Sequence, residues 1–283
     1  MSFKSINGWH IIYNFFGIKI KKRYTPDLCH KLNLIYDTEE GIGNRVFGLI
    51  DYVNCTKPKQ VNIYWDNSGW VTAKFKELFE YTSDFELNEY NNKEIIKGWK
   101  NKWKGDNTEI TVYQPPVHMA NNEGRELSYK DITEEEFEKY STEFKKLKPS
   151  QKVRERINSI NLPDKFTALQ VRNAKDWDEY GREESMSKFF EQIDKYPSDT
   201  KFYLSAMNNE VSNEIKQKYG DRILELPDKN YKSMIDAVAD LFIMSYAESA
   251  IYSYGSTFGE LAFWLSEKYQ KITIVGNDSG WIK

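Results

Sequence analysis

Glycine, two hydroxyl side chains and a predicted helix start come together in residues 253–260, a combination suited to binding phosphate. The segment follows a short apolar run, and residues 261–265 after it are typical of a helix. A chain that turns through Gly255, Ser256 and Thr257 into a helix presents backbone N–H groups and hydroxyls at the positive end of the helix dipole. The same residues also suit an ordinary helix N-cap, so the sequence leaves both interpretations open.

Two carboxylates upstream, Asp236 and Asp240, are four residues apart in a stretch that predicts a helix over residues 235–246. This spacing places both side chains on one face of a helix. Fixed hydrogen-bond acceptors beside a phosphate cradle are typical of a nucleotide site. We therefore expect these two segments to meet.

A second glycine-rich turn contains Gly41, Gly43, Asn44 and Arg45 and stands between a predicted strand and a predicted helix. The two glycines let the backbone turn tightly and approach a ligand, and Asn44 and Arg45 can reach anionic or hydroxyl groups. The third glycine of the dinucleotide fingerprint is missing, which disfavours NAD binding. A tight turn without a ligand is the alternative.

Arg172 follows a predicted strand over residues 166–171, in which Gln170 alternates with buried apolar positions. Ligands of α/β sheets bind at the carboxyl ends of the strands. A guanidinium there stays charged and can hold a diphosphate through two parallel hydrogen bonds. A surface ion pair with Asp176 or Asp178 is the alternative.

Five acidic residues follow closely, and a carboxylate among them could remove the proton from an acceptor hydroxyl. The group consists of Asp176, Asp178, Glu179, Glu183 and Glu184. Solvated loop charges are the other interpretation of such a cluster. No histidine occurs after His118, so a Ser/His/Asp or Cys/His triad has no support.

Composition excludes several classes of protein. The chain has 283 residues with 40 basic and 43 acidic side chains, a balance that argues against a nucleic-acid binder with a broad basic surface. Its three histidines are scattered, so we expect no metal site and no cofactor. Two cysteines without a CxxC pattern fit a reducing compartment, and we expect a cytoplasmic protein.

Aromatic residues beside a basic cluster occupy the segment that begins at Trp9 and ends at Arg23. Such a segment could lie at an anionic membrane surface, as a peripheral contact. The alternative is a first segment packed on the body with a solvated basic tip. No run of 18 apolar residues exists, and the N-terminus lacks the pattern of a signal peptide.

Predicted strands alternate with predicted helices along the whole chain, as in α/β proteins. Thr133 and Glu136 have the spacing of a capping box at the start of a helix over residues 134–147. We predict an acceptor-side α/β domain over residues 1–148 and a donor-binding domain over residues 149–283. The strands are predicted at residues 33–36, 61–65, 109–113, 166–171, 201–205, 249–254 and 271–275. Further helices are predicted at residues 44–54, 73–79, 152–159, 185–195, 211–219 and 259–268.

Several segments, in their order along the chain, resemble a family of nucleotide-sugar transferases. This family includes the bacterial nodulation α-1,6-fucosyltransferase and the core α-1,6-fucosyltransferase of animals. The resembling parts, which together span residues 41–265, are the glycine-rich turn at 41–45 with the strand after it, residues 147–157, Gln170-Val171-Arg172 with Asp176, residues 202–209, and Asp240 with residues 253–258.

The resemblance implies a GT-B type α/β fold, two Rossmann-like domains with the active site in the cleft between them. It also implies transfer of fucose from GDP-fucose, with inversion and without a metal ion, and we expect a glycan or lipid-linked oligosaccharide as acceptor. Under it, Arg172 binds the diphosphate, Ser256 and Thr257 hold the phosphates, and Asp240 accepts hydrogen bonds from guanine. The predicted donor site is Gly41, Gly43, Asn44, Arg45, Gln170, Arg172, Asp240, Tyr254, Gly255, Ser256, Thr257 and Phe258. The predicted catalytic residues are Arg172, Asp176 and Glu183.

The chain departs from the family's His-x-Arg-Arg-x-Asp motif at three positions. Gln170 replaces the histidine, Asn173 replaces the second arginine, and Lys175 stands where the acid is expected. Glutamine can donate and accept hydrogen bonds but carries no charge. The sequence therefore leaves two alternatives open: a transferase that uses another GDP- or UDP-sugar, and an inactive glycan- or nucleotide-binding protein.

Overall fold

The structure is a computed structural model. It describes residues 3–7, 10–15, 18–23, 29–36, 38–91, 102–103, 109–113, 119–120, 126–172, 182–183 and 186–278. Contacts divide the chain into two compact units. The first unit consists of Met1–Glu40, Asn44–Asp66 and Ser83–Ser128; the second consists of Gly41–Gly43, Asn67–Thr82 and Tyr129–Lys283. Residues 129–148, which the sequence analysis assigned to the N-terminal domain, therefore pack with the second unit.

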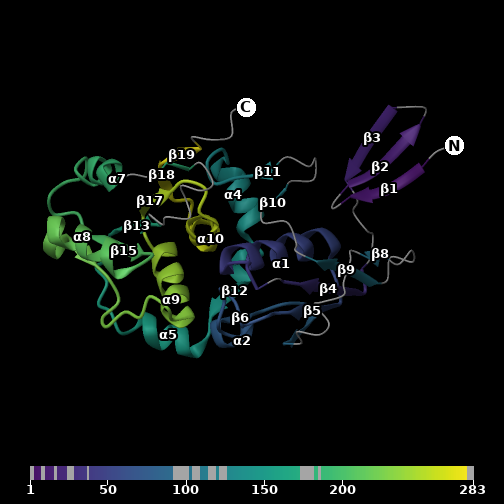
Figure 1. Ribbon diagram of the computed structural model, residues 1–283, viewed down its shortest axis with the longest axis horizontal. Helices are drawn as coiled ribbons and strands as arrows, with labels where there is room; N and C mark the ends of the chain where they lie inside the picture. Colours follow the sequence, from purple (N-terminus) through teal and green to yellow (C-terminus); the bar gives the residue numbers. More distant parts are fainter. Residues whose placement is uncertain are drawn as a thin grey trace. The chain divides into compact units, whose positions relative to one another are not determined.

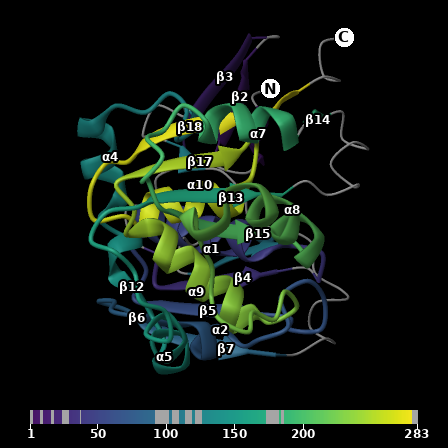
Figure 2. The ribbon, with the colours of Figure 1, turned by 90° about the vertical axis from the view of Figure 1, so that its left-hand side faces the viewer.

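The second unit is built on a five-stranded parallel sheet with the strand order of a Rossmann-like fold (Figure 2). Of these five strands, the one that comes first in the sequence lies at the centre, with two later strands on each side of it. The sheet contains, from edge to edge, β16 (Ile223–Leu224), β15 (Phe202–Ala206), β13 (Thr167–Val171), β17 (Ser249–Ser253) and β18 (Lys271–Val275). The strand order reverses between β13 and β17, which is where such sheets bind ligands.

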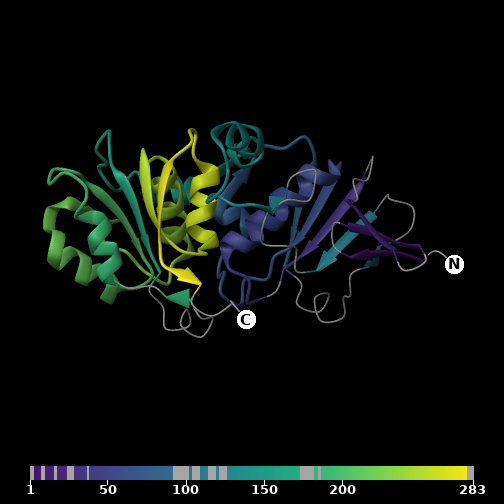
Figure 3. The same cartoon turned by 90° about the horizontal axis from the view of Figure 1, so that it is seen from above.

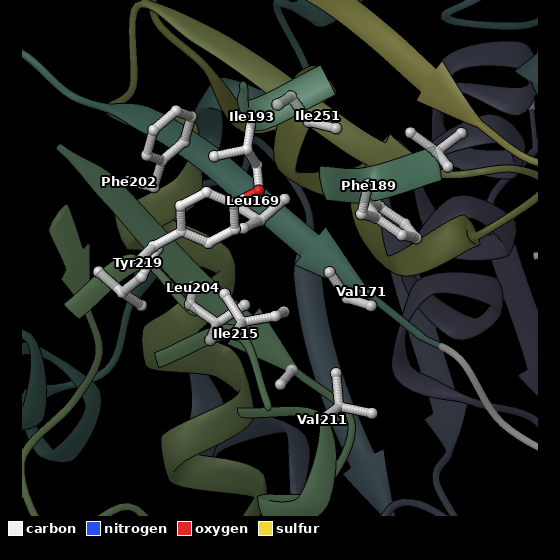
Figure 4. Packing of buried hydrophobic residues seen from close by; sticks show 13 residues of the cluster. Leu169, Val171, Phe189, Ile193, Phe202, Leu204, Val211, Ile215, Tyr219 and Ile251 are labelled. Carbon is white, nitrogen blue, oxygen red and sulfur yellow. The ribbon is translucent and has the colours of Figure 1, made fainter. Parts of the chain in front are cut away.

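Helices cover both faces of this sheet, as buried parallel strands require. Figure 3 shows α7 (Met186–Ile193) and α8 (Asn209–Tyr219) on one side of the strands, with α9 (Met234–Ser245) and α10 (Thr257–Leu265) on the other. Side chains of α7 and α8 pack onto Leu169, Leu204 and Ile251 of the strands (Figure 4). This apolar cluster fixes the strand ends that carry the candidate site.

A layer of short elements completes the second unit (Figure 1). Strand β6 (Phe79–Tyr81) pairs antiparallel with β12 (Leu147–Pro149), although about seventy residues separate them in the sequence. The Ser150 amide also donates to the Leu78 carbonyl. The neighbouring elements are α2 (Phe75–Leu78), α4 (Glu134–Ser141), a 3-10 helix (Phe144–Lys146) and α5 (Gln151–Ile157).

The first unit also contains a five-stranded sheet, parallel except for β8 at one edge. Helix α1 (Ile42–Thr56) begins after the central strand and buries Val46, Leu49, Ile50 and Val53. The strands, from edge to edge, are β7 (Glu86–Tyr90), β5 (Gln60–Tyr64), β4 (Lys31–Ile35), β9 (Glu109–Tyr113) and β8 (Lys102–Trp103).

One face of the first unit's sheet carries a polar row that crosses four strands in register. Asn62 donates to Asn33, Asn33 donates to Thr111, and Asn88 donates to Asn62. Asn33 and Asn62 are buried, so their amides depend on these neighbours. A shift of one residue between strands would break the row, which therefore specifies their register.

The N-terminal segment forms a separate three-stranded antiparallel sheet of β1 (Phe3–Asn7), β2 (His10–Phe15) and β3 (Ile18–Arg23). The sequence analysis predicted no strands there. Contact of this segment with a membrane surface stays a prediction. Two-stranded pairs are formed by β10 (Met119–Ala120) with β11 (Glu126–Leu127), and by β14 (Arg182–Glu183) with β19 (Asn277–Asp278). Among the described residues, no helix is long and apolar enough to cross a membrane.

Candidate functional site

The carboxyl ends of β13 and β17 are joined by Ser253, the last residue of β17. Its hydroxyl donates to the Gln170 carbonyl at 3.3 Å and accepts from the Arg172 amide at 2.9 Å. The Gln170 side-chain oxygen accepts from the Ser253 amide at 3.2 Å. Gln170, which stands where the resembling family has histidine, thus fastens the two strands at the point where their order reverses.

Between β17 and α10 the backbone turns through Gly255, whose φ of 63° lies in the region that favours glycine. Ser256 is the N-cap of α10, and its hydroxyl accepts a hydrogen bond from the Gly259 amide at 3.4 Å. The two interpretations of this segment are compatible in the structure, because the capping serine also lines a cavity. The helix therefore directs its positive end toward that cavity.

The glycine-rich turn at residues 41–43 approaches the start of α10 very closely. A Cβ atom placed on Gly43 would lie 2.7 Å from the Thr257 carbonyl oxygen and 2.8 Å from its hydroxyl. Only glycine fits at this position without a shift of the backbone. A Cβ atom on Gly41 would meet nothing within 4 Å.

Asp240, on the second turn of α9, also lines the cavity. Its buried carboxylate accepts from the Tyr203 hydroxyl at 2.6 Å, the Ser205 hydroxyl at 2.8 Å and the Lys229 ammonium at 2.6 Å. Lys229 also pairs with Glu225 at 3.4 Å, and its side chain is only 5% exposed. Two carboxylates thus compensate one buried cation.

The pKa values in this cluster follow from burial and charge. Burial raises the pKa of Asp240, and the hydrogen bonds and the positive charge of Lys229 only partly oppose it. Burial alone would lower the pKa of Lys229, but Asp240 and Glu225 outweigh it and raise the value. Lys229 therefore stays protonated at neutral pH, and its charge opposes the effect of burial on Asp240. Burial raises the pKa of Tyr203 well above its ordinary value, so this residue stays a hydrogen-bond donor.

Asp236, the other predicted carboxylate, has a different role. It accepts from Arg156 of α5 at 2.8 Å and from the Asn230 amide at 2.8 Å. Arg156 donates to the Pro227 carbonyl as well. Asp236 thus holds the loop that carries Lys229.

All residues that line the cavity belong to the second unit, and the cavity has a volume of about 280 Å3. Eight of the twelve predicted donor-site residues line it: Gly41, Gly43, Gln170, Arg172, Asp240, Ser256, Thr257 and Phe258. Segments as far apart in the sequence as residues 41 and 258 thus meet around one space.

The other four predicted donor-site residues do not line the cavity. Arg45 is buried in the first unit, where it donates to the Glu40 and Asp66 carbonyls and lies over the Trp65 ring. Its neighbour Asn44 lies on the first turn of α1. Tyr254 packs under the Lys130 ammonium, 3.6 Å from the ring centroid, and Gly255 forms the turn before α10.

The two carboxylates predicted to be catalytic cannot be placed in the site. Asp176 lies outside the described residues. Glu183 belongs to β14, but the described part of the chain does not include its side chain. Both remain predictions. The described residues contain no group of three or more potential metal ligands.

Several cavity residues escaped the sequence analysis. Lys229 and Tyr231 come from the loop before α9, Trp70 from the loop after β5, and Met207 follows β15. Trp70 and Met207 are 59% and 47% exposed, which is unusual for large apolar side chains. The only sequence feature that could have indicated Lys229 as a cavity residue is its position shortly before the predicted helix that carries Asp240.

Comparison with solved structures identifies the fold. The chain matches NodZ α-1,6-fucosyltransferase soaked with GDP-fucose, with a TM-score of 0.53 and 15% identity over 84% of this chain and 93% of that one. It matches fucosyltransferase NodZ from Bradyrhizobium with a TM-score of 0.55 and 14% identity over 84% and 94% of the two chains. It matches POFUT1 in complex with GDP with a TM-score of 0.57 and 13% identity over 89% and 99%.

No family model matches the sequence, and no curated protein matches it. The likeness to solved structures, at this low identity, establishes the fold. The chain has the GT-B type α/β fold of these fucosyltransferases, with two Rossmann-like units, and the predicted fold class is confirmed.

Proposed function

We propose that the protein is a glycosyltransferase that uses a nucleoside diphosphate sugar, with GDP-fucose as the preferred donor. The observation that carries this proposal is the cavity at the strand switch point, which is lined both by Arg172 and the N-terminus of α10 and by the buried, charged pair of Lys229 and Asp240. A nucleoside diphosphate has the matching polarity, with anionic phosphates at one end and a neutral base at the other. The fold likeness to fucosyltransferases solved with GDP or GDP-fucose supports the same donor.

In this proposal Arg172 and the N-terminus of α10 bind the diphosphate. Arg172 supplies a full positive charge, and Ser256 and Thr257 contribute the start of the helix. As the acceptor oxygen bonds to the anomeric carbon, the bond from that carbon to the diphosphate breaks. Charge then builds on the leaving group, where fixed cations and dipoles have the largest effect. The transfer proceeds with inversion and without a metal ion.

The acceptor hydroxyl must lose its proton as the new bond forms. Asp176 and Glu183 are the candidates for this base, and the acceptor is a glycan or lipid-linked oligosaccharide. The alternative donors, another GDP-sugar or a UDP-sugar, are motivated by Gln170, which replaces the motif histidine, and by the Asn208-Asn209 pair. Because Gln170 carries no charge, the cavity has one cation fewer for the diphosphate.

Calorimetric titration with GDP in EDTA, with UDP in parallel, tests the donor proposal. We expect GDP to bind without metal, and Arg172→Ala to weaken binding by about 100-fold, because a charge-assisted contact is lost. Transfer by this variant should fall by about two to three orders of magnitude. Arg154→Ala removes an exposed arginine of the same unit that does not line the cavity, and should bind as the unaltered protein does.

Each result has a distinct meaning. Tighter binding of UDP than of GDP would indicate a UDP-sugar as the donor and would leave the proposal of a glycosyltransferase intact. Binding of GDP without transfer or hydrolysis over a broad panel of acceptors would favour an inactive binding protein. Failure of both nucleotides to bind would overturn the proposal.

A further inference from the structure

Lys229 is a buried cation on the wall of the cavity, and it has a donor to spare. An ammonium group carries three N–H donors. Within the described residues, two carboxylates accept from it, Asp240 at 2.6 Å and Glu225 at 3.4 Å. The residue nevertheless lines the cavity. A side chain that is 95% buried can offer its third N–H to the protein, to water or to a ligand in that space.

Asp240 has complementary capacity. A carboxylate has roughly four sites for hydrogen-bond donors, and Tyr203, Ser205 and Lys229 supply three. The oxygen that Lys229 contacts already accepts from both Lys229 and Ser205, so the acceptor position that is left lies on the other oxygen, which accepts from Tyr203.

The surroundings of this pair suit a flat, neutral ring. Met234, Ala237 and Asp240 follow one another at three-residue spacing along α9, and all three line the cavity. The first two are apolar, so they can contact the face of a ring while the third meets its edge. The charges of Lys229, Lys216, Glu225 and Asp240 cancel, so this end of the cavity attracts no additional ion.

Resting on the proposed function, we infer that Lys229 determines nucleobase specificity: its ammonium donates to a ring carbonyl while Asp240 accepts from the adjacent ring N–H. Guanine and uracil both present this pairing of carbonyl and ring N–H. Adenine and cytosine present an amino group and an unprotonated ring nitrogen in its place. With either base, the Lys229 ammonium would meet an amino group that is also a donor, or the Asp240 carboxylate would meet a ring nitrogen that is also an acceptor. A buried polar group would then lack a hydrogen-bond partner.

Titration of the full chain with GDP and ADP tests this inference. The unaltered protein should bind GDP at least about 100-fold more tightly than ADP, because one or two buried groups would stay unpaired with adenine. In Lys229→Met this preference should fall to about tenfold or less, since the donor to the ring carbonyl is lost. Lys216 also pairs with Glu225 but does not line the cavity. The matched control Lys216→Met should therefore keep the full preference for GDP over ADP.

A change in the ligand tests the same contact without altering the protein. The diphosphate of 2-aminopurine riboside lacks both the carbonyl and the ring hydrogen of guanine. This analogue should bind the unaltered protein more weakly than GDP does. In Lys229→Met the ratio of the two dissociation constants should be smaller by about tenfold or more, because the contact is already missing. Lys229→Arg keeps the positive charge but moves the donors, so it should stay folded and lose base preference as well.

The outcomes separate this inference from the proposed function. If the unaltered protein binds GDP and both Lys229 variants discriminate against ADP as strongly as it does, the inference is wrong and the proposed function stands. If the unaltered protein binds ADP as tightly as GDP, the inference is wrong as well. If no nucleoside diphosphate binds the unaltered protein, both are overturned.

Discussion

The contact of Gly43 with the start of α10 gives a sharp prediction at the scale of one residue. Gly43→Ala places a methyl group within 2.8 Å of the Thr257 backbone, so the turn or the helix start must move. Such overpacking costs about 1–3 kcal/mol, against a gain of up to about 1 kcal/mol in helix propensity. We expect a net loss of stability and GDP binding weakened by about tenfold or more, because Thr257 lines the cavity.

Gly41→Ala is the control for this prediction, since its methyl group meets nothing within 4 Å. It should change the free energy of unfolding by no more than about 0.5 kcal/mol. Denaturant melts and GDP titration measure both variants. Equal behaviour of the two would refute the steric role of Gly43.

The lowered pKa of Glu225 predicts how the stability of the fold responds to acid. Burial would raise its pKa, but the charge of Lys229 and the hydrogen bonds from Lys216 and Ser212 lower it below the ordinary value of 4.5. The unfolded chain then binds the proton more readily, so stability falls as the pH drops through the folded pKa. As the pH falls below about 4.5, the melting temperature of Glu225→Gln should decline less than that of the unaltered protein.

Asp240 acts in the opposite direction, because its raised pKa favours folding as the proton binds. Because Asp240 and Glu225 share Lys229, the difference between the two proteins reports the acid response of this charged cluster with and without the Glu225 carboxylate. Parallel decline of the two melting temperatures would show that Glu225 contributes nothing to the acid response.

The cavity residues that could be predicted from the sequence are those that strand ends and turn residues specify. Arg172, Ser256 and Gly43 follow predicted strands or open predicted helices, so periodicity could place them. Lys229 comes from an irregular loop, and its position depends on Asp236 and Arg156 holding that loop. No local pattern encodes a position of that kind.

At the scale of elements, the capping box at the start of α4 was predicted and is confirmed. The Thr133 hydroxyl accepts from the Glu136 amide at 3.2 Å, and the Glu136 carboxylate accepts from the Thr133 amide at 3.0 Å. Thr133→Ala should lower the free energy of unfolding by about 1 kcal/mol, measured by denaturant melts. Glu135→Gln, an exposed change in the same turn, should cost no more than about 0.5 kcal/mol. Equal costs would argue against the cap.

Periodicity predicted most of the parallel strands well, because buried strands form apolar runs bounded by turn residues. Strands β9 and β18 have the predicted bounds. Strand β7, Glu86–Tyr90, was missed because its side chains are mostly polar and it lies at a sheet edge. The helix predicted over residues 134–147 was too long. It ends at Ser141, and pairing with β6 draws residues 147–149 into a strand, so tertiary contacts override local helix propensity.

At the scale of the whole molecule, the location of the cavity predicts where a nucleotide will slow hydrogen exchange. All lining residues belong to the second unit. With GDP bound, amides at the carboxyl ends of β13 and β17, in the loop before α9 and at the start of α10 should show the strongest protection. ADP at the same concentration serves as the reference. Protection centred on β5 and β7 of the first unit would contradict this assignment.

The pairing of β6 with β12 bears on how this chain can be cut, exchanged and synthesised. Residues 67–82 are encoded between strands of the first unit but belong to the second, as do residues 41–43. A C-terminal fragment that begins at residue 129 would lack the partner of β12 and the glycine that meets Thr257. Exchanging the two units between related chains by a single crossover would therefore leave both products incomplete. During translation β6 is synthesised well before β12, so the two strands can pair only after residue 149 has been added to the chain.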